Sequence, residues 1–182
     1  MHKFFPTLVR ALPDGCLVVF DADGIYYLDQ HPHLYDELSR FKTILTPNHK
    51  ELVFLQRRFK IDPDAILDHW NPKEEVTELP ANPEHPPFKI IIKGQCDIIM
   101  DRDRSFIIGI EGGNKRCGGI GDIVAGVTGA CGLWDYDYGP ALASVLVRSA
   151  TRMAFEKEGR GMTAPCVLDE LTTVVKRFEL MA

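Results

Sequence analysis

Hydrophobic and polar positions along this chain follow two patterns in turn, which predict strands and helices. Short continuous apolar runs are typical of strands buried on both faces of a sheet, and apolar residues at every third or fourth position indicate amphipathic helices. The strand patterns lie at Cys16–Phe20, Thr43–Thr46, Phe88–Gly94, Asp97–Asp101 and Ser105–Ile110. The helical patterns lie at His33–Phe41, His49–Phe59, Asp62–Trp70, Asp122–Leu133, Gly139–Lys157 and Ala164–Phe178. This alternation predicts an α/β fold.

One stretch, Asn71–Pro87, fits neither pattern. It holds five prolines and several charged residues, so we expect a surface loop there. Strands and helices alternate on both sides of it, so it is not expected to be a linker between domains. The last two strands are separated only by Arg102–Arg104, which predicts a hairpin. With 182 residues and no internal repeat, the chain is expected to form one domain over residues 1–182.

The charge and the cysteine content argue against several classes of protein. A formal net charge of -5 does not suit a surface that binds nucleic acid or an anionic membrane. The five cysteines are scattered and never form a Cys-x-x-Cys pair, which argues against a zinc site or a disulfide framework.

No apolar run approaches the ~20 residues of a membrane span. We expect a soluble, cytoplasmic protein. The alternative is a mitochondrial one, if "MHKFFPTLVRAL" is part of a transit segment and not a helix before the first strand.

The glycine-rich stretch "RCGGIGDIVAGVTGA", from Arg116 to Ala130, follows the last predicted strand and opens a helix. Glycines let backbone N–H groups approach a ligand, and a helix N-terminus carries a partial positive charge, so the stretch predicts a phosphate site. Lys115 and Arg116 are the cations next to it. Asp122 would repel a phosphate unless it has a role of its own. It either accepts the proton of an attacking hydroxyl, as in phosphoryl transfer, or only caps the helix.

Polar residues follow three of the other predicted strands. Asp21 and Asp23 follow the first strand, at the edge where open α/β sheets bind ligands, although acids there also commonly form turns. Asn48 and Glu51 follow the second strand with the spacing of a helix capping box. Lys93 ends the third strand, where its ammonium group either contacts phosphate or remains in solvent.

The stretches "DADG", "LTPNHKEL", "KGQCD" and "EGGNKRCGGIGD" together resemble, in this order, those of the ATP-dependent (S)-NAD(P)H-hydrate dehydratases, in particular the eukaryotic branch. The resemblance runs from about Thr7 to the C-terminus, and four motifs at compatible spacings are more specific than one glycine loop. This family lies within the ribokinase-like superfamily. The resemblance therefore implies a three-layer α/β/α ribokinase-like sandwich with a mostly parallel sheet.

The same resemblance implies which residues form the site. The hydrated nicotinamide nucleotide would contact Asn48, His49, Lys50, Glu51, Leu52, Val53, Phe54 and Asp122. ATP would contact Lys93, Gly94, Gln95, Cys96 and Asp97, and also Gly112, Gly113, Asn114, Lys115, Arg116, Cys117, Gly118, Gly119, Ile120 and Gly121. Asp122 would be the catalytic residue. The resemblance assigns no metal ligands.

The implied chemistry dehydrates the S-form of hydrated NADH or NADPH and so restores the normal cofactor, a metabolite repair reaction of a lyase that uses ATP and Mg²⁺. ATP would phosphorylate the hydroxyl at C6 of the nicotinamide ring, and phosphate would then leave. Asp122 would accept the hydroxyl proton, the amides of Gly119 to Gly121 would hold the phosphoryl group, and Mg²⁺ would bridge the ATP oxygens. Hydrated NADH or NADPH is then the substrate, and an NAD(P)H-hydrate epimerase is a functional partner.

The chain also departs from the family that it resembles. It begins where family members are already well into their domain, so we expect an N-terminally truncated domain with an exposed sheet edge, which favours association with a second copy. Leu52 stands where the family commonly has Phe, and Ile120 where the eukaryotic branch commonly has Gln. Two other functions stay open: a ribokinase-like kinase for a vitamin precursor or sugar, and a non-catalytic remnant that binds nucleotide.

Overall fold

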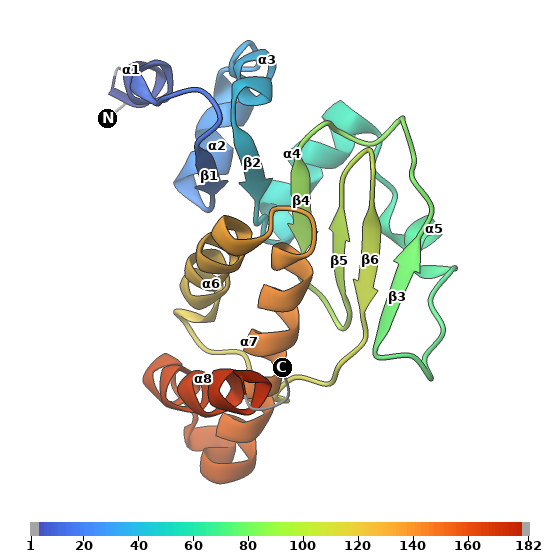
Figure 1. Cartoon of the computed structure of the whole chain (residues 1–182), viewed down its shortest axis with the longest axis vertical. Helices are drawn as coiled ribbons and strands as arrows, with labels where there is room; N and C mark the ends of the chain where they lie inside the picture. The colour runs from blue at the N-terminus through green and yellow to red at the C-terminus, as the bar shows by residue number, and fades with distance from the viewer. Residues whose placement is uncertain (1–3, 180–182) are drawn as a thin grey trace.

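The computed structural model describes residues 4–179, and within them six strands form one sheet in the order β1-β2-β4-β5-β6-β3 (Figure 1). The strands are β1 (Leu17–Phe20), β2 (Lys42–Leu45), β3 (Val76–Leu79), β4 (Lys89–Ile92), β5 (Asp97–Met100) and β6 (Ser105–Ile108). The five predicted strands are all present, and the predicted hairpin is confirmed because β5 and β6 pair antiparallel. β1 and β3 form the two edges of the sheet.

The strand directions divide the sheet into two parts. β1, β2 and β4 are parallel neighbours, whereas β5 is antiparallel to β4 and β6, and β3 is antiparallel to β6. Four of the six strands, β1, β2, β4 and β6, therefore run in the same direction. The three adjacent parallel strands end at one edge, and this is where open α/β sheets place their ligands.

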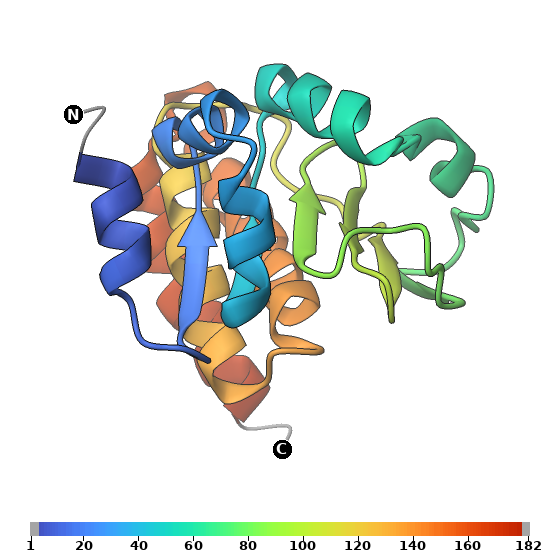
Figure 2. The same cartoon turned by 90° about the horizontal axis from the view of Figure 1, so that it is seen from above.

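Helices cover both faces of the sheet (Figure 2). One face carries α2 (Asp23–Gln30), α3 (Leu34–Glu37), α4 (His49–Phe59) and α5 (Pro63–Leu67), with a 3₁₀ turn at Leu38–Arg40. The other face carries α6 (Ile120–Trp134) and α7 (Gly139–Glu158), and α8 (Ala164–Glu179) packs against α7 after a 3₁₀ turn at Gly159–Gly161. α1 (Phe4–Ala11) precedes β1, as one of the two interpretations of the N-terminal stretch expects; Met1 to Lys3 lie outside the described residues.

Neighbouring residues of the central strands face opposite sides of the sheet, as the period of two in a strand requires. In β4, Ile90 and Ile92 belong to the same buried cluster as Leu55 of α4. Ile91 belongs to a different cluster, which includes Ala141 of α7. Both faces of β4 are therefore buried under helices, which explains why this strand appears in the sequence as a continuous apolar run. The predicted three-layer α/β/α sandwich is confirmed.

Three elements differ from the sequence prediction, and the first is α2, which none of the predicted helical patterns covers. The stretch Asn71–Pro87 is not wholly a loop, because it contains the edge strand β3, which pairs with β6. Val76 and Glu78 of β3 are exposed, so this strand has no apolar run that would reveal it. The helical pattern His33–Phe41 corresponds to the short α3 followed by a 3₁₀ turn and not to one continuous helix.

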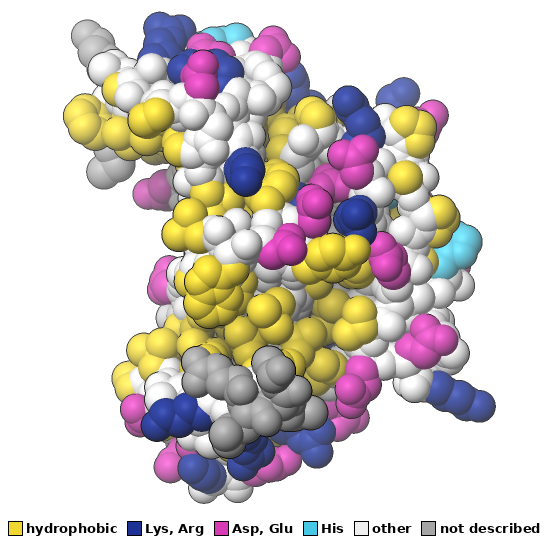
Figure 3. Space-filling view, viewed as in Figure 1, with side chains coloured by type: hydrophobic (Ala, Val, Ile, Leu, Met, Phe, Trp, Pro, Cys, Tyr) yellow, Lys and Arg dark blue, Asp and Glu magenta, His cyan; other side chains and the backbone are white. Residues whose placement is uncertain are grey.

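One face of the molecule exposes large hydrophobic side chains. Figure 3 shows them gathered in the middle of that face, over the α6 and α7 region. Leu133 and Trp134, at the end of α6, are each 74% exposed, and Tyr138 just before α7 is 47% exposed. None of the helices between residues 4 and 179 is long and apolar enough to cross a lipid bilayer.

Candidate functional site

Three polar residues meet where the parallel strands β1, β2 and β4 end. The Thr46 hydroxyl donates to the Asp21 carboxylate over 2.8 Å, and the Lys93 ammonium donates to the Thr46 carbonyl over 2.6 Å. The same ammonium lies 3.7 Å from Asp21 Oδ1. Lys93 is therefore not a freely solvated lysine at a strand end, because the ends of the other two strands hold its charged group in place.

The start of α4 is built as the capping box that the sequence predicts. Asn48 Oδ1 accepts the N–H groups of Lys50 and Glu51 over 2.9 and 3.1 Å, and Glu51 Oε2 accepts the Asn48 N–H over 2.9 Å. Leu52 points into the hydrophobic core. His49 and Lys50 are exposed, so they are the side chains of this turn that are open to a ligand.

The start of α6 contains a left-handed glycine, Gly119, and places a second glycine, Gly121, beside Lys93. Gly119 has φ 91° and is the N-cap residue, whereas Gly121 already has helical backbone. A Cβ atom on Gly121 would lie 3.9 Å from the Lys93 ammonium. The free amides of the first helical turn and the Lys93 ammonium therefore lie next to each other, and both attract an anion.

Asp122 is the third residue of α6 and is exposed. The helix cap is Gly119, and no side-chain hydrogen bond caps the helix. The interpretation of Asp122 as the capping residue is therefore wrong. Its carboxylate makes no hydrogen bond or ion pair with any other residue in the described range. Asp122 lies one position after Gly121, at the point where the helix start meets the ends of the parallel strands.

A cavity of about 480 Å³ lies between the β4–β5 loop, the glycine-rich segment and α7. It brings together the two segments that the resemblance assigns to ATP, and its walls also include residues from α6 and α7. The lining residues from the assigned segments are Lys93, Gly94, Gln95, Asp97, Gly112, Gly113, Asn114, Lys115, Arg116 and Ile120. The further lining residues are Glu111, Val124, Val147, Arg148 and Thr151.

Arg148 of α7 joins the two segments across this cavity. Its guanidinium donates to Asp97 Oδ1 over 3.0 Å and to the Gly94 carbonyl over 3.3 Å. It also donates to the carbonyls of Gln95, in the β4–β5 loop, and Ile110, which leads into the glycine-rich segment. This side chain is 13% exposed, so the guanidinium itself is largely shielded from water, whereas its bonds to Gly94 and Gln95 lie at the surface.

A second residue of α7, Thr151, positions the glycine-rich segment directly. Its hydroxyl accepts the Gly113 N–H over 3.2 Å, and a Cβ atom on Gly113 would lie 2.4 Å from the Thr151 carbonyl oxygen. Only glycine allows this approach. Lys115 anchors the next part of the segment, because its ammonium donates to the carbonyls of Arg160 and Met162. Arg116 is exposed and makes no ion pair with the described residues.

Several assigned residues face away from the cavity. Cys96 is buried in the core beneath the β4–β5 loop, and burial raises the pKa of its thiol. Cys117 packs against the cluster formed by α6, α7 and α8. Gly118, Gly119, Gly121 and Asp122 do not line the cavity but lie in the turn beside it. The assignment of each residue to a ligand stays a prediction.

Sequence reasoning did not single out Ser144, Arg148 and Thr151. They recur on α7 at intervals of four and three positions, which places them on one face of the helix. Ser144 and Thr151 are buried, and the Ser144 hydroxyl donates to Asp97. The sequence therefore shows polar side chains on the buried face of a helix, which indicates that they have polar partners. It does not show which loops these side chains contact.

The lining groups fit a nucleoside triphosphate. Lys93 and Arg116 supply positive charge, and Val124 with Val147 supplies an apolar surface for a base. The N–H donors of the glycine turn at the start of α6 lie beside the cavity. No group of three His, Cys, Asp or Glu side chains that could hold a metal ion occurs in the described part of the chain. Mg²⁺ in phosphoryl-transfer sites is held largely by water and substrate phosphates with one or two carboxylates, so the residues fit an ion that enters with the nucleotide.

Comparison with known proteins shows which family the chain matches. A family model described as NAD(P)H-hydrate dehydratase matches residues 3–173. The chain is 34% identical to an ATP-dependent (S)-NAD(P)H-hydrate dehydratase of Ixodes scapularis over 94% of its own length, and 30% identical to that of Danio rerio over 90%. The homologous protein of Homo sapiens is 28% identical over 85% of this chain.

The match covers only part of each relative. The chain spans 60% of the length of the Ixodes scapularis protein, 52% of the Danio rerio protein and 46% of the human protein. A solved structure of a Streptococcus mutans protein is similar in fold, with a TM-score of 0.69 and 20% sequence identity. That match covers 97% of this chain and 60% of the other.

Proposed function

We propose, from the premise that the chain belongs to the NAD(P)H-hydrate dehydratase family, that it takes part in the ATP-dependent dehydration of the S-form of hydrated NADH and NADPH. The observation that carries the proposal is the position of Lys93. Its ammonium group connects the ends of the parallel strands, through Thr46 and Asp21, to the start of α6 beside Gly121. We call the cavity of about 480 Å³ the nucleotide cavity, because we propose that ATP binds there. The nucleotide cavity and the predicted substrate side therefore share one charged group, the Lys93 ammonium.

Each group in this arrangement has a role in the proposed reaction. ATP supplies the phosphoryl group that turns a poor leaving group, hydroxide, into a good one. Lys93 and the amides of Gly119 to Gly121 hold and neutralise the transferring phosphoryl oxygens. Asp122 accepts the proton of the substrate hydroxyl. The exposed side chains of His49 and Lys50 contact the nicotinamide nucleotide at the start of α4.

Arg148 supports the same reaction without contacting the reacting atoms. It fixes the β4–β5 loop to the segment that leads to Gly112. Preformed loops lose less conformational freedom when ATP binds, which favours binding. Mg²⁺ is proposed to enter with the phosphates of ATP and to neutralise part of their charge.

The proposal is tested by incubating the chain with ATP, Mg²⁺ and hydrated NADH under single-turnover conditions. Recovery of NADH absorbance together with release of one phosphate per NADH supports the dehydratase. A stable phosphorylated product without NADH recovery would instead indicate a small-molecule kinase. Binding of ATP without any turnover, in a folded protein, would indicate a non-catalytic remnant. The human relative under the same conditions is the positive control.

The wider biological setting is proposed from the same family membership. We propose a cytoplasmic or mitochondrial protein that works together with an NAD(P)H-hydrate epimerase. The apolar surface around Leu133 and Trp134 supports association with a second copy of the chain. Light scattering of the parent and of Trp134→Ala tests this: a dimer of the parent that dissociates in the variant supports it, and a monomeric parent overturns it.

A further inference from the structure

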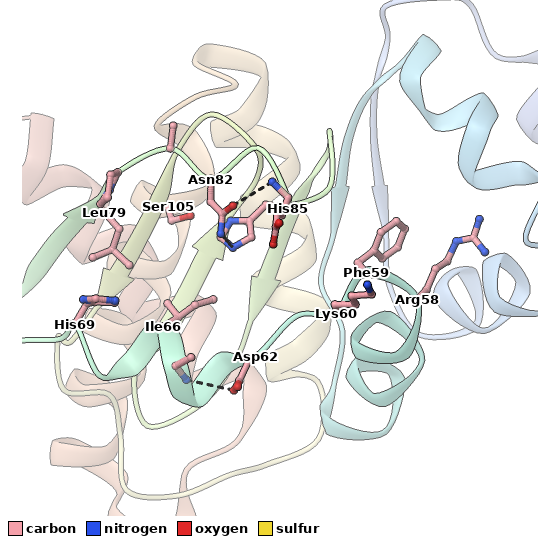
Figure 4. A pocket seen from close by; sticks show the side chains of 14 residues that line it. Arg58, Phe59, Lys60, Asp62, Ile66, His69, Leu79, Asn82, His85 and Ser105 are labelled. Carbon is pink, nitrogen blue, oxygen red and sulfur yellow. Dashed lines mark hydrogen bonds between the residues drawn. The ribbon is translucent and has the colours of Figure 1, made fainter.

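A second cavity of about 770 Å³ lies between α5, the end of α4 and the segment that follows β3 (Figure 4). It shares no lining residue with the nucleotide cavity. Ser105, the first residue of β6, lines this second cavity, whereas Ile110 beyond the other end of β6 accepts a hydrogen bond from Arg148. The two cavities therefore lie at opposite ends of β6, and a ligand here would be separate from the proposed reaction.

The body of this second cavity is apolar. Phe59 at the end of α4, Ile66 of α5 and Leu79 of β3 line it, and all three side chains pack with the main hydrophobic core. The volume lies within the range of about 300 to 1,000 Å³ that is typical of small-molecule sites. An apolar body of this size suits an organic molecule better than a lone inorganic ion.

The hydroxyl of Ser105 is an unpaired polar group in the wall. Ser105 is 1% exposed, and its Oγ has no hydrogen-bond partner among the residues that the structure describes. Buried polar groups in folded proteins are nearly always hydrogen-bonded to protein, water or ligand. Ser105 is drawn among the lining side chains in the close view of the cavity (Figure 4). Its unpaired hydroxyl points to a ligand with an oxygen or nitrogen atom at this place.

Most other polar groups of the wall are already used by the protein. Asp62 caps α5 through one carboxylate oxygen, and the Asn82 amide is bonded to the His85 ring over 3.1 Å. The Arg58 guanidinium lies 4.6 Å from the centre of the Tyr35 ring and points away from the other labelled side chains (Figure 4). Each of these polar groups has a partner within the protein and therefore does not require a ligand.

Lys60 is the exception among the Lys and Arg side chains of the wall. It makes no hydrogen bond or ion pair through its side chain with any residue between 4 and 179, and it lines the cavity at the end of α4. Its backbone is left-handed, with φ 53° and ψ 35°, at a helix end where glycine or asparagine is usual. A lysine kept in an unfavourable conformation without a structural partner points to a role in binding.

We propose that this cavity is a second small-molecule site, which binds an organic acid with an apolar body. The body lies against Phe59, Ile66 and Leu79. The acid group pairs with the Lys60 ammonium, and the Ser105 hydroxyl bonds a second polar atom of the ligand. The Glu84 carboxylate, which also lines the cavity, disfavours a second negative charge, so the ligand carries one acid group.

Isothermal titration with 2-naphthoate tests the site, with uncharged 2-naphthamide as the matched probe of the same shape. We expect 2-naphthoate to bind at least about tenfold more tightly than the amide, which is the scale of one hydrogen bond to a charged group. Saturating ATP should leave this affinity unchanged. Absence of 2-naphthoate binding to the folded protein at millimolar concentration, equal affinity for both probes, or competition by ATP would overturn the proposal.

Three variants locate the binding. Lys60→Gly relieves the left-handed backbone, so it should raise the unfolding temperature and yet weaken 2-naphthoate binding about tenfold. Ala65 is an exposed residue of α5 that lines the cavity, so Ala65→Trp should fill the cavity and abolish binding. Ala130 is an exposed residue of α6 that does not line it, so Ala130→Trp should leave binding unchanged. Unchanged binding in Lys60→Gly or in Ala65→Trp would contradict the assignment, and a loss shared by Ala130→Trp would do so too.

Discussion

The guanidinium of Arg148 donates to the carboxylate of Asp97 over 3.0 Å, and this pair joins the two loops that line the cavity in which we propose that ATP binds. The side chains are 13% and 9% exposed. Asp97 also accepts the Gly94 N–H over 3.2 Å, while Arg148 donates to the carbonyls of Gly94, Gln95 and Ile110. Every polar group of the pair therefore has a partner, which is the condition under which a buried ion pair organises a site.

Arg148→Lys should weaken ATP binding by about tenfold or more, because one ammonium group cannot reproduce the planar set of five guanidinium donors. Arg148→Ala should also lower the free energy of unfolding by about 3 kcal/mol, since it leaves the Asp97 charge unpaired. Arg152→Ala, one turn further along α7, is the control. It removes an exposed pair with Glu156 and should change stability by no more than about 1 kcal/mol. ATP titration and denaturant unfolding measure both effects, and parent-like ATP affinity in Arg148→Lys would contradict the positioning role.

Lys93→Ala should weaken nucleotide binding by about 1.5 to 3 kcal/mol, the scale of a hydrogen bond to a charged group. The parent ammonium is held by the Thr46 carbonyl and lies 3.7 Å from Asp21, so it is already placed when the phosphates arrive. The measurement is an ATP titration at low salt, with Lys73→Ala in the exposed proline-rich stretch as the control. If ATP affinity stays at the parent value, Lys93 does not contact the nucleotide and has only a structural role, in which it contacts the ends of the neighbouring strands.

Gly119→Val should abolish ATP binding and leave binding of the nicotinamide nucleotide intact. Gly119 has φ 91°, which a branched side chain does not tolerate, and a Cβ atom there would lie 2.9 Å from the Cβ of Ala164. Gly118→Ala is the matched control in the same turn, because a Cβ atom on Gly118 meets nothing within 4 Å. Circular dichroism checks the fold. Loss of both ligands together with unfolding would show that Gly119 serves the packing of α6 against α8.

Cysteine labelling should separate the buried thiols from the thiol of the glycine loop. Burial raises the pKa of Cys96 and of Cys131, and the Arg148 charge only partly opposes this at Cys96. A raised pKa leaves less thiolate at a given pH, so both should react slowly with iodoacetamide near about pH 8 and faster only as the pH rises. Half-buried Cys117 should react before both of them. Mass spectrometry of labelled peptides identifies the order; labelling of Cys96 or Cys131 ahead of Cys117 would contradict the argument from burial.

The sequence predicts best those elements in which local pattern and burial agree. The helix His49–Phe59 has the predicted bounds, because its capping box and its apolar stripe act within the same eleven residues. The strand around Ile90 to Ile92 is equally plain, since helices bury both of its faces and every position is apolar. The convergence of Asp21 and Lys93 follows from the rule that parallel strands end at one edge.

Elements that depend on distant partners were not predictable in the same way. α2 begins after Ala22, which has φ 45° and no side-chain cap, so it lacks a local start signal. Its stability comes from Ile25 and Leu28, which are fully buried against other elements. β3 pairs only with β6, about thirty residues later in the chain, and half of its side chains are exposed. The role of Arg148 likewise depends on loops that approach α7 only in the folded chain.

Asp122→Asn distinguishes a proton acceptor from a residue that only stabilises α6. Gly119 is the helix cap, and Asp122 is exposed in the first turn, so the substitution should lower stability by no more than about 1 kcal/mol, the favourable interaction of its charge with the helix dipole. Turnover should fall by about 10² to 10⁴, because an amide cannot accept the hydroxyl proton. ATP should bind as well as before or more tightly, since a negative charge near the phosphates is removed.

The measurement for Asp122→Asn is single-turnover conversion of hydrated NADH at saturating ATP, beside ATP titration and thermal unfolding of the same preparation. If the chain from Met1 proves inactive, the substitution is made at the equivalent aspartate of the human relative, which contains the additional length. Asp135→Asn is the control, because Asp135 is an exposed acid at the other end of α6 whose carboxylate accepts backbone N–H groups of Asp137 and Tyr138. It should leave turnover unchanged. A folded Asp122→Asn protein that binds ATP and still turns over at the parent rate would remove Asp122 from the mechanism and leave its charge with a structural role only.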